Sequence, residues 1–217
     1  MTLSLFDEPP APCTASEPIA PGAVLLRGFA RDQAEALIQA AQQVIAAAPL
    51  RHLITPGGRA MSVGMSNCGA LGWTSSRTGY RYTRNDPLTS QPWPPMPACF
   101  ADMALRAAAE AGFDNFKPDA CLINRYEAGA RMALHQDRDE NDLGAPIVSV
   151  SLGLPAVFLF GGLQRGDRPA RWPLAHGDVV VWGGASRLAF HGVAPLADGE
   201  HPGLGSQRIN LTFRRAG

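Results

Sequence analysis

The sequence predicts a protein of mixed α and β class that is mainly β, with two helices packed behind an antiparallel barrel or jelly roll. Apolar residues with helical spacing occur only in the first half of the chain. After Pro118 the pattern changes to short apolar or alternating runs separated by glycine-rich turns, which is typical of barrels and jelly rolls. Because helices come first and strands follow, a helix-backed β fold is favoured over a β–α–β sheet.

Length and composition favour one globular domain. The chain has 217 residues, 46% of them hydrophobic and 18% charged, so it can bury a core without disulfides. No apolar stretch approaches the roughly 18 residues that span a bilayer. Asp7, Glu8 and Pro9 stand where a secretory signal would need a basic start. We therefore expect a cytoplasmic protein with no membrane segment.

The cysteines and the net charge exclude few classes of protein. The four cysteines, at 13, 68, 99 and 121, form no C-x-x-C pair, so we expect reduced thiols rather than a zinc or redox motif. Nineteen basic residues balance 19 acidic ones, so net charge neither requires nor excludes a polyanionic partner. The distribution is uneven, because residues 51–90 are arginine-rich and residues 121–142 are acidic. Solvated loops could also produce both segments.

The first element along the chain is a tail, followed by a helix. Residues 1–20 are rich in Pro, Ser and Ala, which predicts a flexible tail before a single domain at 21–217. Apolar residues with helical spacing then predict an amphipathic helix from Asp32 to about Ala48, with Asp32 and Glu35 as a capping pair and Pro49 as the stop.

A second helix is predicted from Ala98 to Ala111, with Asp102 and Arg106 paired on its exposed side and Gly112 at its end. The region between the helices, about residues 51–97, is dense in Gly, Pro, Arg and aromatic residues and has weak periodicity. A segment of this length and composition predicts a lid or binding loop.

Six strands are expected in the barrel region, about residues 118–217. They are Ala120–Tyr126, Ile147–Leu152, Ala156–Phe160, Asp178–Trp182, Leu188–Val193 and Arg208–Arg214.

Two H-x-D motifs could carry metal chemistry, and the motif alone is weak because chance produces it readily. Residues i and i+2 of an extended chain project to the same face, so an imidazole and a carboxylate can bind one metal. His135 and Asp137 fit this arrangement at a strand end. His176 and Asp178 flank Gly177 in a turn, and we interpret them as hairpin-turn residues.

A facial triad of ligands needs one further imidazole from a distant strand. His191 is the candidate, because it follows Leu188, Ala189 and Phe190 in a predicted strand. A hydrogen-bonded core histidine is the alternative interpretation.

The last strand places Arg208, Asn210, Thr212 and Arg214 on one face and apolar residues on the other. Two arginines provide forked donors for the two ends of a small dicarboxylate, although solvent-facing strands show the same alternation. A six-residue separation spans about 20 Å of strand. Both arginines therefore reach one small acid only if their side chains lean together.

Ordered motifs from about Pro21 to the carboxyl terminus carry a family resemblance. They are Asn124-Arg125-Tyr126, His135-x-Asp137, His191, Arg208-x-Asn210-x-Thr212-Phe213-Arg214, Thr-Pro-Gly-Gly at 55–58, Asn-Cys-Gly at 67–69, Leu-Gly-Trp at 71–73 and Gly-Asp-Val-Val-Val-Trp-Gly-Gly at 177–184. Together they resemble the AlkB family of iron- and 2-oxoglutarate-dependent dioxygenases.

The resemblance implies a double-stranded β-helix, or jelly roll, in which the region at 51–97 is a nucleotide-recognition lid. His135, Asp137 and His191 would bind Fe(II). By the same resemblance, the residues that would hold 2-oxoglutarate are Asn124, Tyr126, Arg208, Asn210 and Arg214.

The reaction implied is O2-dependent oxidative demethylation of 1-methyladenine and 3-methylcytosine, with release of formaldehyde, succinate and CO2. The expected substrate is single-stranded DNA, with double-stranded DNA and RNA as further partners, and we expect a monomer. The base must leave the stack to reach a buried oxidant. Residues that match the family's nucleotide contacts are Thr55, Met61, Met65, Trp73, Tyr80, Asp139 and Arg165, with Trp73 as a stacking platform opposite His135.

The charges of the alkylated bases and of nearby side chains independently support this interpretation. The alkylated bases are cationic near neutral pH, so Asp139 beside an aromatic face should favour them. Basic residues of the lid, which we expect to face phosphates, are Arg51, Arg77, Arg81 and Arg84. Departures from the family pattern are Arg59 where an aromatic residue is usual, Gln164 where a basic one is usual, and an end at Gly217 without a basic tail.

Two alternatives stay open. A dioxygenase of the same fold could hydroxylate a protein side chain or a small molecule. A cupin-like barrel could bind metal or sugar without catalysis, although the pair of Arg208 and Arg214 argues against it.

Overall fold

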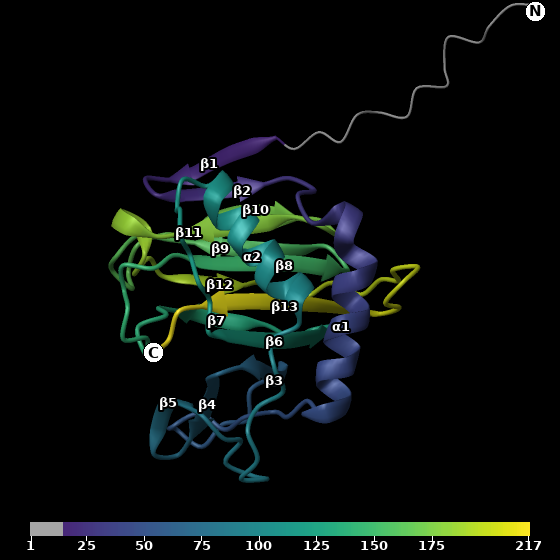
Figure 1. The fold of residues 1–217 in the computed structure, drawn as a ribbon. Coiled ribbons are helices and arrows are strands. Elements are labelled where there is room, and N and C mark those ends of the chain that lie inside the picture. The colour runs from purple at the N-terminus through teal and green to yellow at the C-terminus, as the bar shows by residue number, and fades with distance from the viewer. Residues whose placement is uncertain (1–14) are drawn as a thin grey trace, which may run out of the picture.

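A computed structural model describes residues 15–217 as two stacked antiparallel sheets with two helices outside them (Figure 1). The larger sheet has the strand order β1-β2-β11-β8-β13-β6-β3. Its strands are β1 (Ser16–Ala20), β2 (Ala23–Leu26), β3 (Gly64–Gly69), β6 (Ala120–Glu127), β8 (Ile147–Gly153), β11 (Val179–Trp182) and β13 (Gln207–Arg214).

The smaller sheet has the order β10-β9-β12-β7, and a separate hairpin pairs β4 with β5. These strands are β4 (Gly72–Ser76), β5 (Gly79–Thr83), β7 (Met132–His135), β9 (Ala156–Phe160), β10 (Ala170–Leu174) and β12 (His191–Val193). The helices are α1 (Ala34–Ala47) and α2 (Ala98–Glu110), with 3-10 turns η1 (Arg31–Gln33) and η2 (Gly184–Ser186). The predicted helix-backed jelly roll is confirmed.

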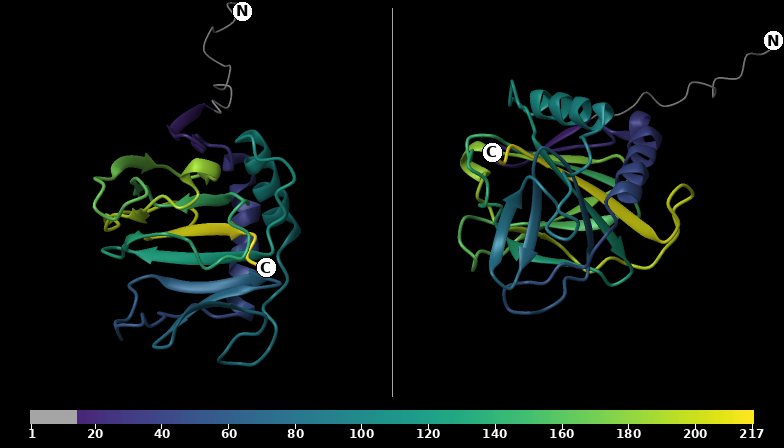
Figure 2. Two further views of the ribbon diagram at one scale, coloured as in Figure 1. Left: turned by 90° about the vertical axis from the view of Figure 1, so that its left-hand side faces the viewer. Right: turned by 60° about the horizontal axis from the view of Figure 1, so that its bottom comes forward.

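Both helices cover one face of the larger sheet (Figure 2). Leu37 of α1 and Met103 of α2 belong to a core cluster with Leu211 and Phe213 of β13. A second cluster, which includes Tyr126 and Trp182, fills the space between the sheets. Every strand of the larger sheet except β1 therefore presents one face to the helices and the other to the barrel interior.

The two predicted helices are confirmed, with one correction. Asp32 lies in η1, and α1 begins after Gln33 without any side-chain cap, so the capping pair of Asp32 and Glu35 does not form. The 3-10 turn occupies the residues that the capping box would need. In α2, Arg106 and Asp102 pair at 3.2 Å, and Gly112 follows the helix with a φ of 82°.

Two other boundaries were wrong. Residues 16–20, expected in the tail, form β1 by pairing with β2, and residues 1–14 lie outside the described part of the chain. The strand predicted at 188–193 begins only at His191. Turn hydrogen bonds from Ser186 N to Gly183 O and from Ala189 N to Ser186 O hold the preceding residues in another conformation.

The region at 51–97 is not one loop. Strand β3 extends the larger sheet by pairing with β6, and β4 and β5 form a hairpin beyond it. Within residues 15–217, no helix has the length and apolar character that a membrane crossing requires. Cys68, Cys99 and Cys121 are free thiols, and Cys13 lies outside the described residues.

Candidate active site

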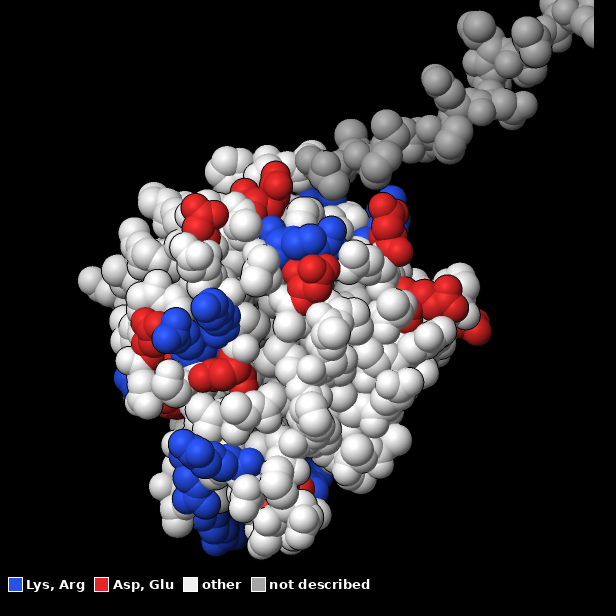
Figure 3. Space-filling view, in the orientation of Figure 1, with Lys and Arg blue, Asp and Glu red and all other residues white. Residues whose placement is uncertain are grey.

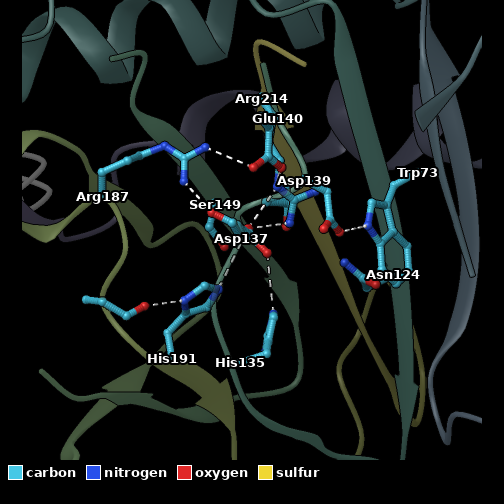
Figure 4. A network of polar contacts seen from close by, with 12 residues as sticks. Trp73, Asn124, His135, Asp137, Asp139, Glu140, Ser149, Arg187, His191 and Arg214 are labelled. Carbon is cyan, nitrogen blue, oxygen red and sulfur yellow. Dashed lines mark hydrogen bonds and ion pairs between the residues drawn. The ribbon is translucent and has the colours of Figure 1, made fainter. Parts of the chain in front are cut away.

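Three side chains from different elements meet at one mouth of the barrel (Figure 4). His135 ends β7, Asp137 follows two residues later, and His191 begins β12 directly opposite His135 in the sheet register. His135 Nε2 lies 3.6 Å from Asp137 Oδ1, and His191 Nε2 lies 3.8 Å from Asp137 Oδ2. Their candidate ligand atoms all lie within 4.8 Å of one another. Two imidazoles and one carboxylate form the donor set of non-haem Fe(II) sites.

Each imidazole is oriented by its own backbone. His135 Nδ1 lies 2.9 Å from the carbonyl of Ala133, and His191 Nδ1 lies 3.0 Å from that of Ala189. A carbonyl can only accept, so Nδ1 carries the proton in both rings and Nε2 keeps its lone pair. Both Nε2 atoms therefore have the form that binds a metal.

Burial and neighbouring charges also set the protonation states of the candidate metal ligands. Burial raises the pKa of Asp137, but Arg214 and the two imidazoles outweigh burial and hold the pKa well below its ordinary value. Burial and the neighbouring His135 lower the pKa of His191 to about 3. Asp137 is consequently ionised and His191 neutral at pH 7, as metal binding requires.

The second H-x-D motif is structural, as predicted. Asp178 accepts hydrogen bonds from the backbone N–H groups of Gly28 and Ala175 and from the Arg27 side chain. His176 Nδ1 accepts from the N–H of Gly153 at 3.0 Å. These contacts hold the turn before β11.

The two arginines of β13 have different partners. Arg208 is 1% exposed, donates from Nε to Ser151 Oγ at 2.9 Å and lies over the ring of Tyr126 at 4.9 Å. Its Nη1 has no hydrogen-bond partner, and no carboxylate within the described residues pairs with it. Arg214 instead donates to Asp137 Oδ2 from Nε at 2.8 Å and Nη2 at 2.6 Å.

A buried guanidinium with an orphaned donor costs free energy unless an anion binds it. Burial also lowers the pKa of Arg208. The residues present therefore fit a dicarboxylate such as 2-oxoglutarate.

Amide side chains line the same face. Asn124 Nδ2 donates to Asn210 Oδ1 at 3.2 Å, and Asn210 Nδ2 donates to Ser149 Oγ at 2.8 Å. Asn124 Oδ1 is buried without a partner. Tyr126 is 2% exposed, and burial raises the pKa of its phenol. These polar residues face the barrel interior rather than solvent.

The β4–β5 hairpin brings an aromatic side chain toward this mouth. Trp73 Nε1 donates to Asp139 Oδ2 at 3.0 Å, and the Trp73 ring stacks on Tyr80 with centroids 5.4 Å apart. Asn67 holds the Trp73 backbone, donating from Nδ2 to its carbonyl at 3.0 Å and accepting from its N–H at 2.9 Å. Trp73 is half-buried rather than part of the core.

Four other residues expected at the nucleotide have different local surroundings. Thr55 accepts the N–H of Arg59 within a turn, and Met61 is half-buried. Met65 is 3% exposed and lines a cavity of 250 Å³ with Trp73. Exposed Arg165 donates to the carbonyl of Leu134, next to His135.

One basic residue was misassigned. Arg51 was expected to face phosphates, but both of its terminal nitrogens donate to Asp86 at 2.6 Å. This bidentate pair occupies the guanidinium within the protein.

The sequence did not predict a buried network of polar side chains behind Asp137. Glu140 accepts from Tyr82 Oη at 2.6 Å and from Arg187 Nη2 at 3.1 Å, and Arg187 Nη1 donates to the Asp137 carbonyl at 2.6 Å. Glu140 stood in the predicted acidic segment, but no spacing connected it with Arg187 or Tyr82. Only the fold brings these three elements together.

Comparisons with known proteins decide the family. The family model of the 2OG-Fe(II) oxygenase superfamily matches residues 22–214. The chain belongs to this superfamily. The alpha-ketoglutarate-dependent dioxygenase AlkB of Escherichia coli is 59% identical over 201 residues, covering 93% of each chain.

Two further members of the superfamily are similar to this chain. The nucleic acid dioxygenase ALKBH1 of Homo sapiens is 33% identical over 134 residues, covering 60% of this chain and 34% of that protein. The solved structure of OsALKBH1 has a TM-score of 0.80 at 28% identity, covering 93% of this chain and 100% of that one. Membership in the superfamily makes the protein a dioxygenase that uses Fe(II), 2-oxoglutarate and O2.

Proposed function

We propose that this 2OG-Fe(II) oxygenase repairs nucleic acid by oxidative demethylation of N-alkylated bases. The substrates are 1-methyladenine and 3-methylcytosine, chiefly in single-stranded DNA, with double-stranded DNA and RNA as further substrates. The observation that carries the proposal is the pairing of Trp73 with Asp139 beside the triad. The names of the AlkB and ALKBH1 relatives support the same substrate class.

His135, Asp137 and His191 hold Fe(II) in this proposal, through two Nε2 atoms and a carboxylate. When bound together, iron, 2-oxoglutarate and O2 supply the oxidising chemistry that hydroxylates the N-methyl group, which is then lost as formaldehyde. The contribution of the protein is to position the methyl group near this centre and exclude water from it.

Arg208 binds one carboxylate of 2-oxoglutarate, because its orphaned Nη1 lies inside the barrel. Arg214 serves the other end, beside Asp137. Asn124, Asn210 and Tyr126 supply the remaining polar contacts along β6 and β13.

The alkylated base stacks on Trp73 and faces His135. Asp139 lies at the edge of the Trp73 ring, so a cationic base gains both a cation–π contact and a carboxylate. A neutral base lacks the charge that makes these contacts favourable. The site therefore discriminates alkylated from normal bases by charge.

The nucleic-acid backbone lies along the lid. Lys and Arg side chains gather over the β4–β5 hairpin (Figure 3), where Arg77, Arg81 and Arg84 are exposed. The other nucleotide contacts that we propose are Thr55, Met61, Met65, Tyr80 and Arg165. Contacts to phosphate position a strand without reading its sequence. We further propose that the protein acts in the cytoplasm as a monomer, with the domain extended to residues 16–217 because β1 pairs with β2.

Formaldehyde release from a methylated single-stranded oligonucleotide tests the proposal. We expect release that needs iron, 2-oxoglutarate and O2 together. Trp73→Ala should weaken oligonucleotide turnover while 2-oxoglutarate consumption without oligonucleotide stays largely intact. Trp172→Ala, which removes a half-buried indole on β10, is the matched control. Equal oligonucleotide turnover by Trp73→Ala and wild type would point to a protein or small-molecule substrate instead.

A further inference from the structure

The β4–β5 hairpin contacts the segment after the metal ligand Asp137 at two neighbouring points. Trp73 and Tyr82 are directly opposite each other in the hairpin register, so their side chains share one face. Trp73 Nε1 donates to Asp139, and Tyr82 Oη donates to Glu140 at 2.6 Å. The first contact belongs to the base site described above. The contact between Tyr82 and Glu140 has no role in the function proposed above.

The partner of Tyr82 is a buried carboxylate. The Glu140 side chain is 2% exposed, so its charge depends on the donors around it. Tyr82 Oη and Arg214 Nε both approach Oε1, at 2.6 and 3.4 Å, and Arg187 Nη2 approaches Oε2 at 3.1 Å. Tyr82 is the nearest of the three donors, and it is the only one that comes from the hairpin.

Arg214 lies between two buried carboxylates. Its Nε is 2.8 Å from Asp137 Oδ2 and 3.4 Å from Glu140 Oε1. The guanidinium therefore favours Asp137 in the present arrangement. Removing the hydroxyl of Tyr82 would leave Arg214 Nε as the nearest donor to Glu140 Oε1, and an unsatisfied buried carboxylate attracts a cation strongly.

We propose that Tyr82 is a positioning residue for 2-oxoglutarate binding. By occupying Glu140 Oε1, the Tyr82 hydroxyl keeps Arg214 on Asp137, where it meets the diacid. The inference rests on the proposed function, because that function assigns Arg214 to 2-oxoglutarate. The inference goes further than the proposed function in one respect. Tyr82, a side chain of the lid hairpin that is remote from the diacid, sets the position of Arg214.

Tyr82→Phe tests this role. We expect the KM for 2-oxoglutarate to rise at least about fivefold, the scale of one typical lost hydrogen bond, while kcat with saturating 2-oxoglutarate changes less than about twofold. The matched control is Thr83→Val, because Thr83 Oγ1 is a buried hydroxyl on the same strand with no partner. Thr83→Val should leave the KM for 2-oxoglutarate unchanged.

A double-mutant cycle with Glu140→Gln shows whether Tyr82 acts through Glu140. The amide has no charge to attract Arg214, so adding Tyr82→Phe to Glu140→Gln should change the KM less than about twofold. A fivefold effect that persists in the Glu140→Gln background would overturn the proposal. Equal KM values for Tyr82→Phe and wild type would overturn it as well.

Hydrogen exchange of the metal-free protein supplies a second readout. We expect the backbone amides of β4 and β5 to exchange faster in Tyr82→Phe than in Thr83→Val, because the hairpin loses one of its two side-chain contacts with the 139–140 segment. Faster exchange with an unchanged KM would make Tyr82 only a structural contact and refute the positioning role.

Arg214→Lys separates failure of this inference from failure of the proposed function. If Arg214→Lys raises the KM for 2-oxoglutarate and Tyr82→Phe does not, only the role of Tyr82 is wrong. If neither variant changes that KM, the diacid site of the proposed function is wrong, and the inference falls with it.

Discussion

At the scale of single residues, the site is built from charges that the protein buries before any ligand arrives. Asp137 is held by Arg214, whereas Arg208 is buried with a free donor and no carboxylate partner among the described residues. An uncompensated buried cation is costly to the fold, and it is useful only if an anion pairs with it. Because of this asymmetry, we propose Arg208 as the receptor for the diacid.

Arg208→Met should therefore raise the KM for 2-oxoglutarate at least about tenfold, since charge-assisted hydrogen bonds are lost. The same variant should unfold no more readily than wild type, because the buried charge disappears with its contacts. Steady-state kinetics and urea unfolding measure the two effects. Arg171→Met, at an exposed arginine of β10, is the control. An unchanged KM in Arg208→Met would exclude Arg208 from the diacid site.

His176 gives a pH prediction away from the metal ligands. Burial lowers the pKa of His176 below 6.5, and the nearby His201 and Arg31 add to the effect. The unfolded chain therefore binds the proton more tightly, so the stabilisation is complete above pH 6.5 and is lost as pH falls below it.

Urea unfolding at about pH 7.5 and about pH 5.5 measures this loss. We expect the free energy of unfolding to decrease less in His176→Gln than in wild type, because the amide can still accept from Gly153 but does not titrate. His52→Gln, at an exposed histidine, is the comparison. An identical pH dependence in wild type and His176→Gln would contradict the account.

Residue chemistry was predictable where spacing encodes geometry. His135 and Asp137 share a face because an extended chain alternates, and Gly177 between His176 and Asp178 indicated a turn. Glu140 and Arg187 could not be connected in this way. They are 47 residues apart, and their contact depends on how the loop after β7 folds against the segment before β12.

At the scale of elements, β13 connects the core to the site. Ile209, Leu211 and Phe213 pack toward the helices, while the alternate polar residues face the barrel interior. One strand thus holds both the apolar contacts that stabilise the sheet and the donors that would bind the diacid. Its alternation was predicted, but the burial of both faces was not, because a second sheet covers the polar side.

Leu211→Ala should lower the free energy of unfolding by about 2–5 kcal/mol, because Leu211 is 0% exposed and a packed core relaxes only partly around a deleted side chain. Urea denaturation measures the change. Leu105→Ala, at a 48% exposed position on α2, should change stability far less. A loss from Leu211→Ala no larger than that from Leu105→Ala would show that β13 is not central to the core.

Helices with clear periodicity were predicted well, whereas several short strands were missed. Strand β3 reads Gly-Met-Ser-Asn-Cys-Gly and β10 reads Ala-Arg-Trp-Pro-Leu, and neither alternates clearly. Both form because a neighbouring strand offers hydrogen bonds, β6 for β3 and β9 for β10. Pairing of this kind depends on tertiary context rather than local propensity.

At the scale of the whole molecule, a net charge of zero conceals a separation of charge. Exposed arginines gather over the β4–β5 hairpin, whereas the carboxylate of Asp139 lies at the edge of the Trp73 ring. We propose that these arginines attract phosphates and that Asp139 attracts a cationic base. The arrangement suits a strand that stays outside while one base enters.

Salt dependence of oligonucleotide binding tests the rim. Replacing Arg77, Arg81 and Arg84 by Ala should reduce the slope of log K against log salt by about 2, since each phosphate contact on a single strand contributes about 0.7. Fluorescence anisotropy with a labelled oligonucleotide measures it. A triple Ala variant with the wild-type slope would place the strand elsewhere.

The central claim is that two imidazoles and one carboxylate bind a single ferrous ion beside a site for 2-oxoglutarate. Anaerobic titration with Fe(II) and 2-oxoglutarate, followed by visible absorption, measures it most directly. We predict a charge-transfer band that saturates at one iron per chain in wild type and is absent from His191→Ala. A wild-type protein without the band, or a His191→Ala protein that retains it at full strength, would contradict the account.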